Sequence, residues 1–144
     1  MMKQRETIRV LMAKAGLDAH ERGLLVVSMG LKDEGMEVVY TGLRQTPEAV
    51  VQAAIQEGVD VVGISSLAGG HSGFVSKLTQ KAQEKGFDLN DILLLVGGII
   101  PDDDKATLKN MGVSATFGPG TSIKEIANYI RKNIKSKKAV IGAG

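Results

Sequence analysis

The chain of 144 residues has no cysteine, no tryptophan and only two histidines, His20 and His71. Without cysteine, disulfides, zinc–thiolate centres and thiol nucleophiles are excluded. Aromatic residues make up 3% of the chain, too few for the stacking platforms that bind single-stranded nucleic acid. No apolar run reaches the roughly 18 residues of a membrane span, and the charged N-terminus lacks a signal-peptide core. We therefore expect a cytoplasmic protein that binds neither nucleic acid nor membranes.

Hydrophobic residues make up 43% of the chain and charged residues 24%, which is typical of a soluble globular domain. The length fits one domain with a substantial core. The formal net charge is +2, and the positive excess gathers near the C-terminus. We expect a domain over residues 1–134, followed by a basic and flexible tail over residues 135–144. The basic residues in and before this tail are Arg131, Lys132, Lys135, Lys137 and Lys138.

Apolar and β-branched runs predict five strands, and a helical pattern follows each of them. The strands are expected at residues 7–13, 37–40, 61–65, 92–96 and 115–117. The helices are expected at residues 21–34, 46–58, 74–86 and 101–112, and from residue 122 onward. Thr46 before Pro47 predicts a capped helix start, and Ser122 with Glu125 has the spacing of a capping box.

The apolar residues of segment 21–34 are spread widely around the helix, so we expect this helix to be buried on more than one side. These residues are Leu24, Leu25, Val26, Val27, Met29 and Leu31. In the second helix, Val51, Ala54 and Ile55 are expected to point inward.

Regular alternation of strands and helices with short connections predicts a parallel sheet covered by helices on both faces. At this length the natural architecture is the flavodoxin-like α/β fold, a five-stranded Rossmann-like sheet in the order 2-1-3-4-5. Ligands of such folds bind outside the carboxyl ends of the strands. The unusual loops all leave the strands at that edge: 14–23, 65–73, 97–98 and 118–121. This convergence predicts a binding site there.

Several familiar sites are excluded by the residues at this edge. A receiver domain needs acidic residues where this chain has Lys14 and Ser65. No dinucleotide-binding or P-loop glycine pattern is present, no nucleophile elbow occurs, and no zinc-ligand spacing is found. What remains is His20, with Asp18 as a carboxylate that could accept its second ring N–H. Taken separately, the histidine could equally lie in an exposed surface loop and the glycines could be turn residues.

Together, three motifs resemble the signature of cobalamin-binding domains. They are Asp18-Ala19-His20-Glu21-Arg22-Gly23, Ser65-Ser66-Leu67 and Gly97-Gly98, in a five-fold strand–helix chain. The resemblance extends from about Ile8 to Ile134. Ala19 stands where the family often has glycine, at a variable position of the motif. The loops 65–71 and 117–121 resemble those of the methylmalonyl-CoA mutase C-terminal domain.

The resemblance implies adenosylcobalamin bound with its own base displaced from cobalt and His20 as the axial cobalt ligand. Asp18 and Lys14 would extend the relay behind His20, and the nucleotide tail would enter a pocket in the sheet edge. His71 is expected to be a loop residue at the border of this site and not a second ligand. The residues implied in cofactor binding are Asp18, Ala19, His20, Glu21, Arg22, Gly23, Ser65, Leu67, Gly69, Gly70, Gly97, Gly98, Phe117, Gly118 and Thr121.

The resemblance also implies an isomerase: the small subunit of an acyl-CoA mutase that supports a radical 1,2-rearrangement. A separate (β/α)₈ barrel subunit would bind the acyl-CoA, and the small subunit would be inactive alone. Two alternatives stay open, a corrinoid carrier for methyl transfer and a cobalamin-binding sensor or chaperone without catalysis. The acyl-CoA, the oligomeric state and the identity of the large subunit are not determined by these residues.

Overall fold

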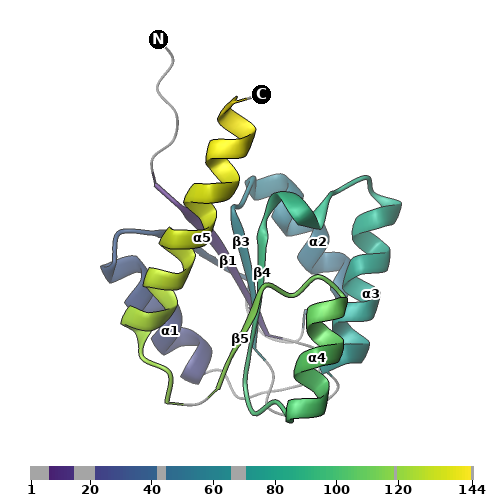
Figure 1. The fold of residues 1–144 in the computed structure, drawn as a ribbon, viewed down its shortest axis with the longest axis horizontal. Helices are drawn as coiled ribbons and strands as arrows, with labels where there is room; N and C mark the ends of the chain where they lie inside the picture. Colours follow the sequence, from purple (N-terminus) through teal and green to yellow (C-terminus); the bar gives the residue numbers. More distant parts are fainter. Residues whose placement is uncertain (1–6, 15–21, 42–44, 66–70, 119, 144) are drawn as a thin grey trace.

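The computed structural model describes residues 7–14, 22–41, 45–65, 71–118 and 120–143, with the backbone alone at 22, 71, 72 and 135–143. Its centre is a five-stranded parallel sheet in the order β2-β1-β3-β4-β5 (Figure 1). The strands are β1 (Arg9–Lys14), β2 (Glu37–Tyr40), β3 (Val61–Ser65), β4 (Leu93–Gly97) and β5 (Ala115–Phe117). The predicted flavodoxin-like fold and strand order are confirmed.

Helices cover both faces of the sheet, α1 and α5 on one side and α2, α3 and α4 on the other (Figure 1). The helices are α1 (Arg22–Asp33), α2 (Pro47–Glu57), α3 (His71–Glu84), α4 (Asp102–Asn110) and α5 (Ile123–Ala143), with a short 3₁₀ turn η1 (Leu89–Asp91). His71 opens α3, so the prediction that its backbone belongs to the preceding loop is wrong. The helix starts earlier than the apolar pattern of Phe74 and Val75 indicates.

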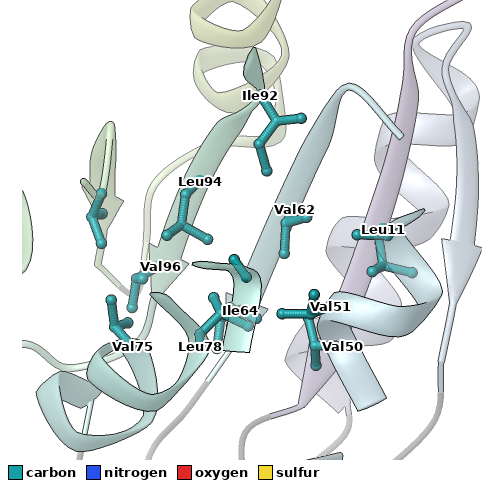
Figure 2. Close-up of a cluster of buried hydrophobic side chains, with 14 of the residues drawn as sticks. Leu11, Val50, Val51, Val62, Ile64, Val75, Leu78, Ile92, Leu94 and Val96 are labelled. Atoms are coloured by element: carbon teal, nitrogen blue, oxygen red, sulfur yellow. The ribbon is translucent and has the colours of Figure 1, made fainter. Parts of the chain in front are cut away.

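Successive side chains of each strand point to opposite faces of the sheet, and this divides the core into two hydrophobic clusters. Leu11, Val62 and Leu94 point toward α2 and α3, where they pack against Val51 and Leu78 (Figure 2). The residues between them on the strands form the second cluster, beneath α1 and α5. Its fully buried members include Val10, Val61, Leu93, Leu24, Leu31, Ala127 and Ile130.

One face of α1 is buried and the opposite face is open to solvent. Leu25, Val26 and Met29 are 37%, 52% and 65% exposed, so the prediction of burial on more than one side is wrong for this helix. A helix in the outer layer packs against the sheet and an adjacent helix, and apolar residues on its remaining surface have no covering partner in the described part of the chain. Ile55 of α2 is exposed for the same reason, contrary to its predicted inward orientation.

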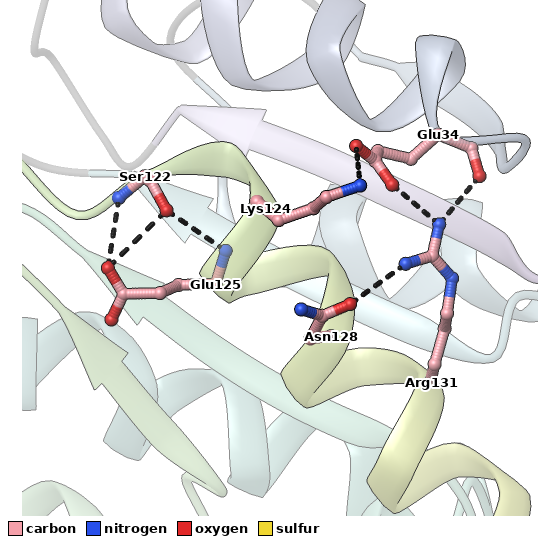
Figure 3. A network of polar contacts seen from close by, with 6 residues as sticks. All are labelled: Glu34, Ser122, Lys124, Glu125, Asn128 and Arg131. Atoms are coloured by element: carbon pink, nitrogen blue, oxygen red, sulfur yellow. Dashed lines mark hydrogen bonds and ion pairs between the residues drawn. The ribbon is translucent and has the colours of Figure 1, made fainter.

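The predicted start signals of α2 and α5 are confirmed. The Thr46 hydroxyl accepts a hydrogen bond from the Ala49 backbone N–H at 3.1 Å. At the start of α5 the Ser122 hydroxyl accepts from the Glu125 N–H at 3.1 Å, while the Glu125 carboxylate accepts from the Ser122 N–H at 3.4 Å. This reciprocal pair is a capping box (Figure 3). Helix α5 then continues to Ala143, so residue 134 is not a helix boundary.

Helices α1 and α5 are held against each other by close packing and by charge. A Cβ on Gly30 would overlap the Ile123 side chain, so glycine is what permits the close approach. The Arg131 guanidinium donates to the Glu34 carboxylate at 2.7 Å and to the Glu34 carbonyl at 2.8 Å, and Lys124 lies 3.5 Å from the same carboxylate (Figure 3). The C-terminal end of α1 is therefore anchored to α5.

This anchor makes a prediction about acid stability. The hydrogen bond from Arg131 lowers the pKa of Glu34 below its usual 4.5, with Lys124 adding to the effect. A carboxylate with a lowered pKa stabilises the fold above its unfolded-state pKa and loses that contribution as the pH falls through the folded-state pKa. We expect Glu34→Gln to destabilise the protein at pH 7, as measured by urea denaturation at each pH. The difference from the wild type should begin to shrink below about pH 4.3 and should vanish only below the lowered folded-state pKa. Glu57→Gln, at an exposed position of α2, should show no such convergence. If the difference in unfolding free energy between the wild type and Glu34→Gln stayed constant with pH, the lowered pKa of Glu34 would be contradicted.

Candidate cofactor site

Four residues at the carboxyl edge of the sheet lie in one row across four neighbouring strands. Lys14 pairs with Ser65, Ser65 with Gly97, and Gly97 with Phe117. Each lies two positions beyond a residue that faces α1 and α5, and side chains two apart share a face. The row therefore faces the α1–α5 side of the sheet.

Beneath α1 and α5, next to this row, lies a cavity of about 790 Å³. This volume is within the range of small-molecule and cofactor sites. The strands contribute its floor, the two helices its roof, and the loops after β4 and β5 its rim. The lining residues are Val10, Met12, Gly23, Leu24, Val26, Val27, Leu31, Val61, Gly63, Ile64, Ser65, Leu95, Val96, Gly97, Gly98, Phe117, Gly118, Gly120, Thr121, Ile126 and Ile130.

Two glycines in the strands keep the cavity open. Gly63 is in the middle of β3 and Gly97 at the end of β4, both on the α1–α5 face. Among the described residues, a Cβ on Gly97 would have one neighbour within 4 Å, the Phe117 carbonyl oxygen at 3.6 Å, so it would project into the cavity. A Cβ on Gly63 would come within 2.9 Å of the Met12 sulfur. A methyl group on Gly97 would narrow the cavity, and one on Gly63 would displace the Met12 side chain that lines it.

The rim on the β5 side is held in place by aromatic packing. The rings of Phe117 and Tyr129 meet edge to face with centroids 5.7 Å apart, a favourable aromatic arrangement. The Tyr129 hydroxyl donates to the Ser114 carbonyl at 3.1 Å, and burial raises the pKa of this phenol. Phe117 is thereby fixed between α5 and the cavity. Next to it, Thr121 donates to the Gly118 carbonyl at 2.8 Å and closes the loop.

Lys14 ends β1 with only 1% of its surface exposed. A buried ammonium group is costly unless it is hydrogen-bonded or paired. The backbone carbonyl of Lys14 accepts from the Gln45 N–H at 3.2 Å, which joins the end of β1 to the segment before α2. The lysine thus belongs to the interior of the same edge. It is not one of the residues that line the cavity.

All the predicted cofactor-binding residues whose side chains the structure describes lie around the cavity. They are Gly23, Ser65, Gly97, Gly98, Phe117, Gly118 and Thr121. The others lie outside the described side chains. They are Asp18, Ala19, His20, Glu21, Arg22, Leu67, Gly69 and Gly70. Among the described residues, no group of three or more histidine or acidic side chains is placed to hold a metal ion.

Sequence reasoning missed the deep part of the cavity, which Met12 and Gly63 line together with side chains of α1 and α5. One available signal was Gly63 itself, because a glycine inside an otherwise apolar strand often marks a close approach of another group. The helix residues gave no such signal, since apolar stripes line cores and cavities alike. No helix in the described part of the chain is long and apolar enough to cross a membrane.

The fold and this cavity define an α/β domain with an apolar cavity at the carboxyl edge of its parallel sheet. Residues 8–128 match the family model described as the B12 binding domain. The chain therefore belongs to the B12-binding domain family.

Relatives of known name fall into two groups. The chain is 42% identical over 132 residues to the 2-hydroxyisobutanoyl-CoA mutase small subunit of Aquincola tertiaricarbonis, with 92% of this chain and 96% of that protein covered. It is 43% identical over 131 residues to methylmalonyl-CoA mutase of Cereibacter sphaeroides, covering 91% of this chain but only 18% of that protein. The same domain thus occurs in small subunits and as a minor part of much longer mutases.

A solved structure supports the fold alone. A cobalamin-binding protein from Desulfitobacterium hafniense superposes with a TM-score of 0.74 at 15% identity, over 88% of this chain and 59% of that chain.

Proposed function

We propose that this chain is the adenosylcobalamin-binding small subunit of an acyl-CoA mutase, an isomerase that rearranges a carbon skeleton. The observation that carries the proposal is the glycine-carved apolar cavity, which Gly23, the last residue of the motif Asp18-x-His20-x-x-Gly23, helps to line. The mutase part rests on the 42% identity over almost the full length of a mutase small subunit. Cobalamin, when bound, supplies the cobalt–carbon bond whose homolysis starts radical chemistry.

The residues of this chain would bind and orient the cofactor. His20 would hold the cofactor's cobalt through its imidazole, and Asp18 would accept the second ring N–H of His20, which would fix the tautomer and raise the basicity of the ligand. Lys14, buried at the end of β1, would extend the relay behind this pair. Ser65 and Thr121 are hydroxyl groups at the rim of the cavity, suited to the polar sugar–phosphate connection of the cofactor tail.

The acyl-CoA and the reaction centre belong to a second subunit. In relatives such as methylmalonyl-CoA mutase of Cereibacter sphaeroides the matching region is 18% of the chain, so most of that protein is another part. We propose that this other part corresponds to a (β/α)₈ barrel subunit that binds the acyl-CoA and covers the cofactor. The small subunit would then bind cofactor alone but catalyse nothing alone.

The test is a titration of the purified chain with adenosylcobalamin, followed by the visible spectrum, with and without a mutase large subunit. We expect saturable binding with the spectrum of a cofactor coordinated by imidazole. We also expect isomerisation of an acyl-CoA only when both subunits are present. Binding without any activity beside the large subunits of related mutases would favour a carrier or sensor role. Absence of binding in both mixtures would reject the proposal.

A further inference from the structure

Three of the five large hydrophobic side chains that are exposed in the described part of the chain lie on one face of α1. They are Leu25, Val26 and Met29. Because Met29 is four residues from Leu25 and three from Val26, the three side chains form one continuous strip on the helix surface. The other two, Ile55 and Ile99, belong to separate segments of the chain. Single exposed apolar residues are normal on a protein surface, whereas a continuous exposed strip indicates an interaction site.

The strip continues to the end of the helix at Asp33, which is exposed. Val26, Met29 and Asp33 follow one another at intervals of three and four residues, the spacing of the seam between two packed helices. A carboxylate at the C-terminal end of its own helix is disfavoured by the helix dipole, and the first turn of α1, where the dipole favours negative charge, has no acidic residue. An antiparallel partner helix of the same sequence would improve both ends.

We propose that this face of α1 binds the same face of a second copy of the chain, in an antiparallel pair with two-fold symmetry. In such a pair each contact occurs twice, because residue i meets residue j and j meets i. A two-fold axis midway between Val26 and Met29 places Val26 of each copy against Met29 of the other. It also places Asp33 beside the first turn of the partner helix, where the dipole favours its charge. A parallel pair would bring the two Asp33 carboxylates side by side.

The interface is small, because each copy contributes one face of a helix of 12 residues. It is smaller than the roughly 1,200 Å² at which stable interfaces begin, so we expect a reversible dimer with a dissociation constant of about 10–100 μM. The inference goes beyond the proposed function. Of the four residues of the seam, Val26 also lines the cavity, whereas Leu25, Met29 and Asp33 do not, so association and cofactor binding can fail separately.

Met29→Glu tests whether the strip forms the contact. The substitution places a carboxylate from each copy at the centre of an apolar contact, where it loses water without gaining a partner. We expect the dissociation constant to rise by more than about 10-fold, as measured by sedimentation equilibrium. Ile55→Glu is the matched control, because it introduces the same charge at an exposed apolar residue of α2, on the other side of the sheet. It should leave the dissociation constant unchanged.

Asp33→Asn tests the orientation of the two helices. It removes two equivalent contacts between a carboxylate and the start of the partner helix, so we expect about 3- to 30-fold weaker association. The isolated subunit should be no less stable, because the substitution also removes a negative charge from the C-terminal end of its own helix. Thermal unfolding at a concentration well below the dissociation constant measures this second effect.

Cross-linking tests the register, and the absence of cysteine from the chain makes every introduced thiol unique. Val26→Cys and Met29→Cys are mixed in equal amounts and oxidised, and the products are identified by mass spectrometry. The antiparallel register places these two positions opposite each other, so the mixed disulfide should form faster than either disulfide between identical chains.

A wild-type dimer that Met29→Glu dissociates and Ile55→Glu retains, together with the faster mixed disulfide, supports the proposal. A wild type that is monomeric up to about 500 μM overturns it, as do a dimer that Met29→Glu leaves intact and faster disulfides between identical chains. A monomer that binds a mutase large subunit through Met29 would also overturn it and assign this face to that subunit. Titration of Met29→Glu with adenosylcobalamin tests the proposed function independently of all these outcomes.

Discussion

His20→Ala is expected to weaken adenosylcobalamin binding by more than about 100-fold and to abolish the imidazole-coordinated spectrum. Loss of a group that merely orients a metal ligand costs about 10–100-fold in affinity or activity, and loss of the ligand itself should exceed that. His20 comes after β1 in the sequence, and β1 ends at Lys14, in the row of residues beside the cavity. The spectrum reports the ligand directly, and titration of the visible absorbance gives the affinity.

The second histidine provides the control for this prediction. His71 is the first residue of α3, and we expect His71→Ala to retain both the affinity and the spectrum of the wild type. Melting temperatures of the two variants show whether either substitution damages the fold. A wild-type spectrum in His20→Ala would show that cobalt has another ligand. The same loss in His71→Ala would assign that role to His71.

Gly97→Val is expected to weaken cofactor binding by about 100-fold or more while leaving the fold at least as stable. The added side chain projects from the end of β4 into the cavity, where its Cβ meets the Phe117 carbonyl at an ordinary 3.6 Å. Valine favours strands over glycine, so the empty protein tolerates the change. A bound cofactor tail would have to share its space with the new methyl groups, and overpacking costs about 1–3 kcal/mol or more.

These opposite effects on stability and binding separate a blocked site from a damaged fold. Thr116→Val is the matched control, because it adds a valine to the neighbouring strand β5 on the other face of the sheet. It should leave the dissociation constant unchanged. Thermal unfolding and cofactor titration of both variants provide the test. Normal binding by Gly97→Val would show that the cofactor does not use this cavity. A large drop in its melting temperature would show that the valine does not fit.

The order of elements and the strand order could be predicted from the sequence because both depend on local signals. Apolar runs such as 61–65, turn glycines such as Gly58 and the Thr46 cap act within a few residues. Five strand–helix units then leave few topologies, since crossovers between parallel strands are right-handed. The edge at which the loops converge follows from the same rule. The motif around His20 is equally local, and its assignment as a cobalt ligand stays a prediction.

Tertiary structure alone decided which apolar residues are buried and where space is left. Apolar residues in a helical segment show that the helix has an apolar face, but not whether a neighbouring element covers it. Met29 of α1 and Ile55 of α2 are exposed because no described element covers them. The cavity is equally non-local. It exists because Gly63 and Gly97, from two paired strands, lack side chains beneath helices that Gly30 and the Arg131–Glu34 pair hold together. Packing of distant segments determines such a volume, and no stretch of the sequence contains it.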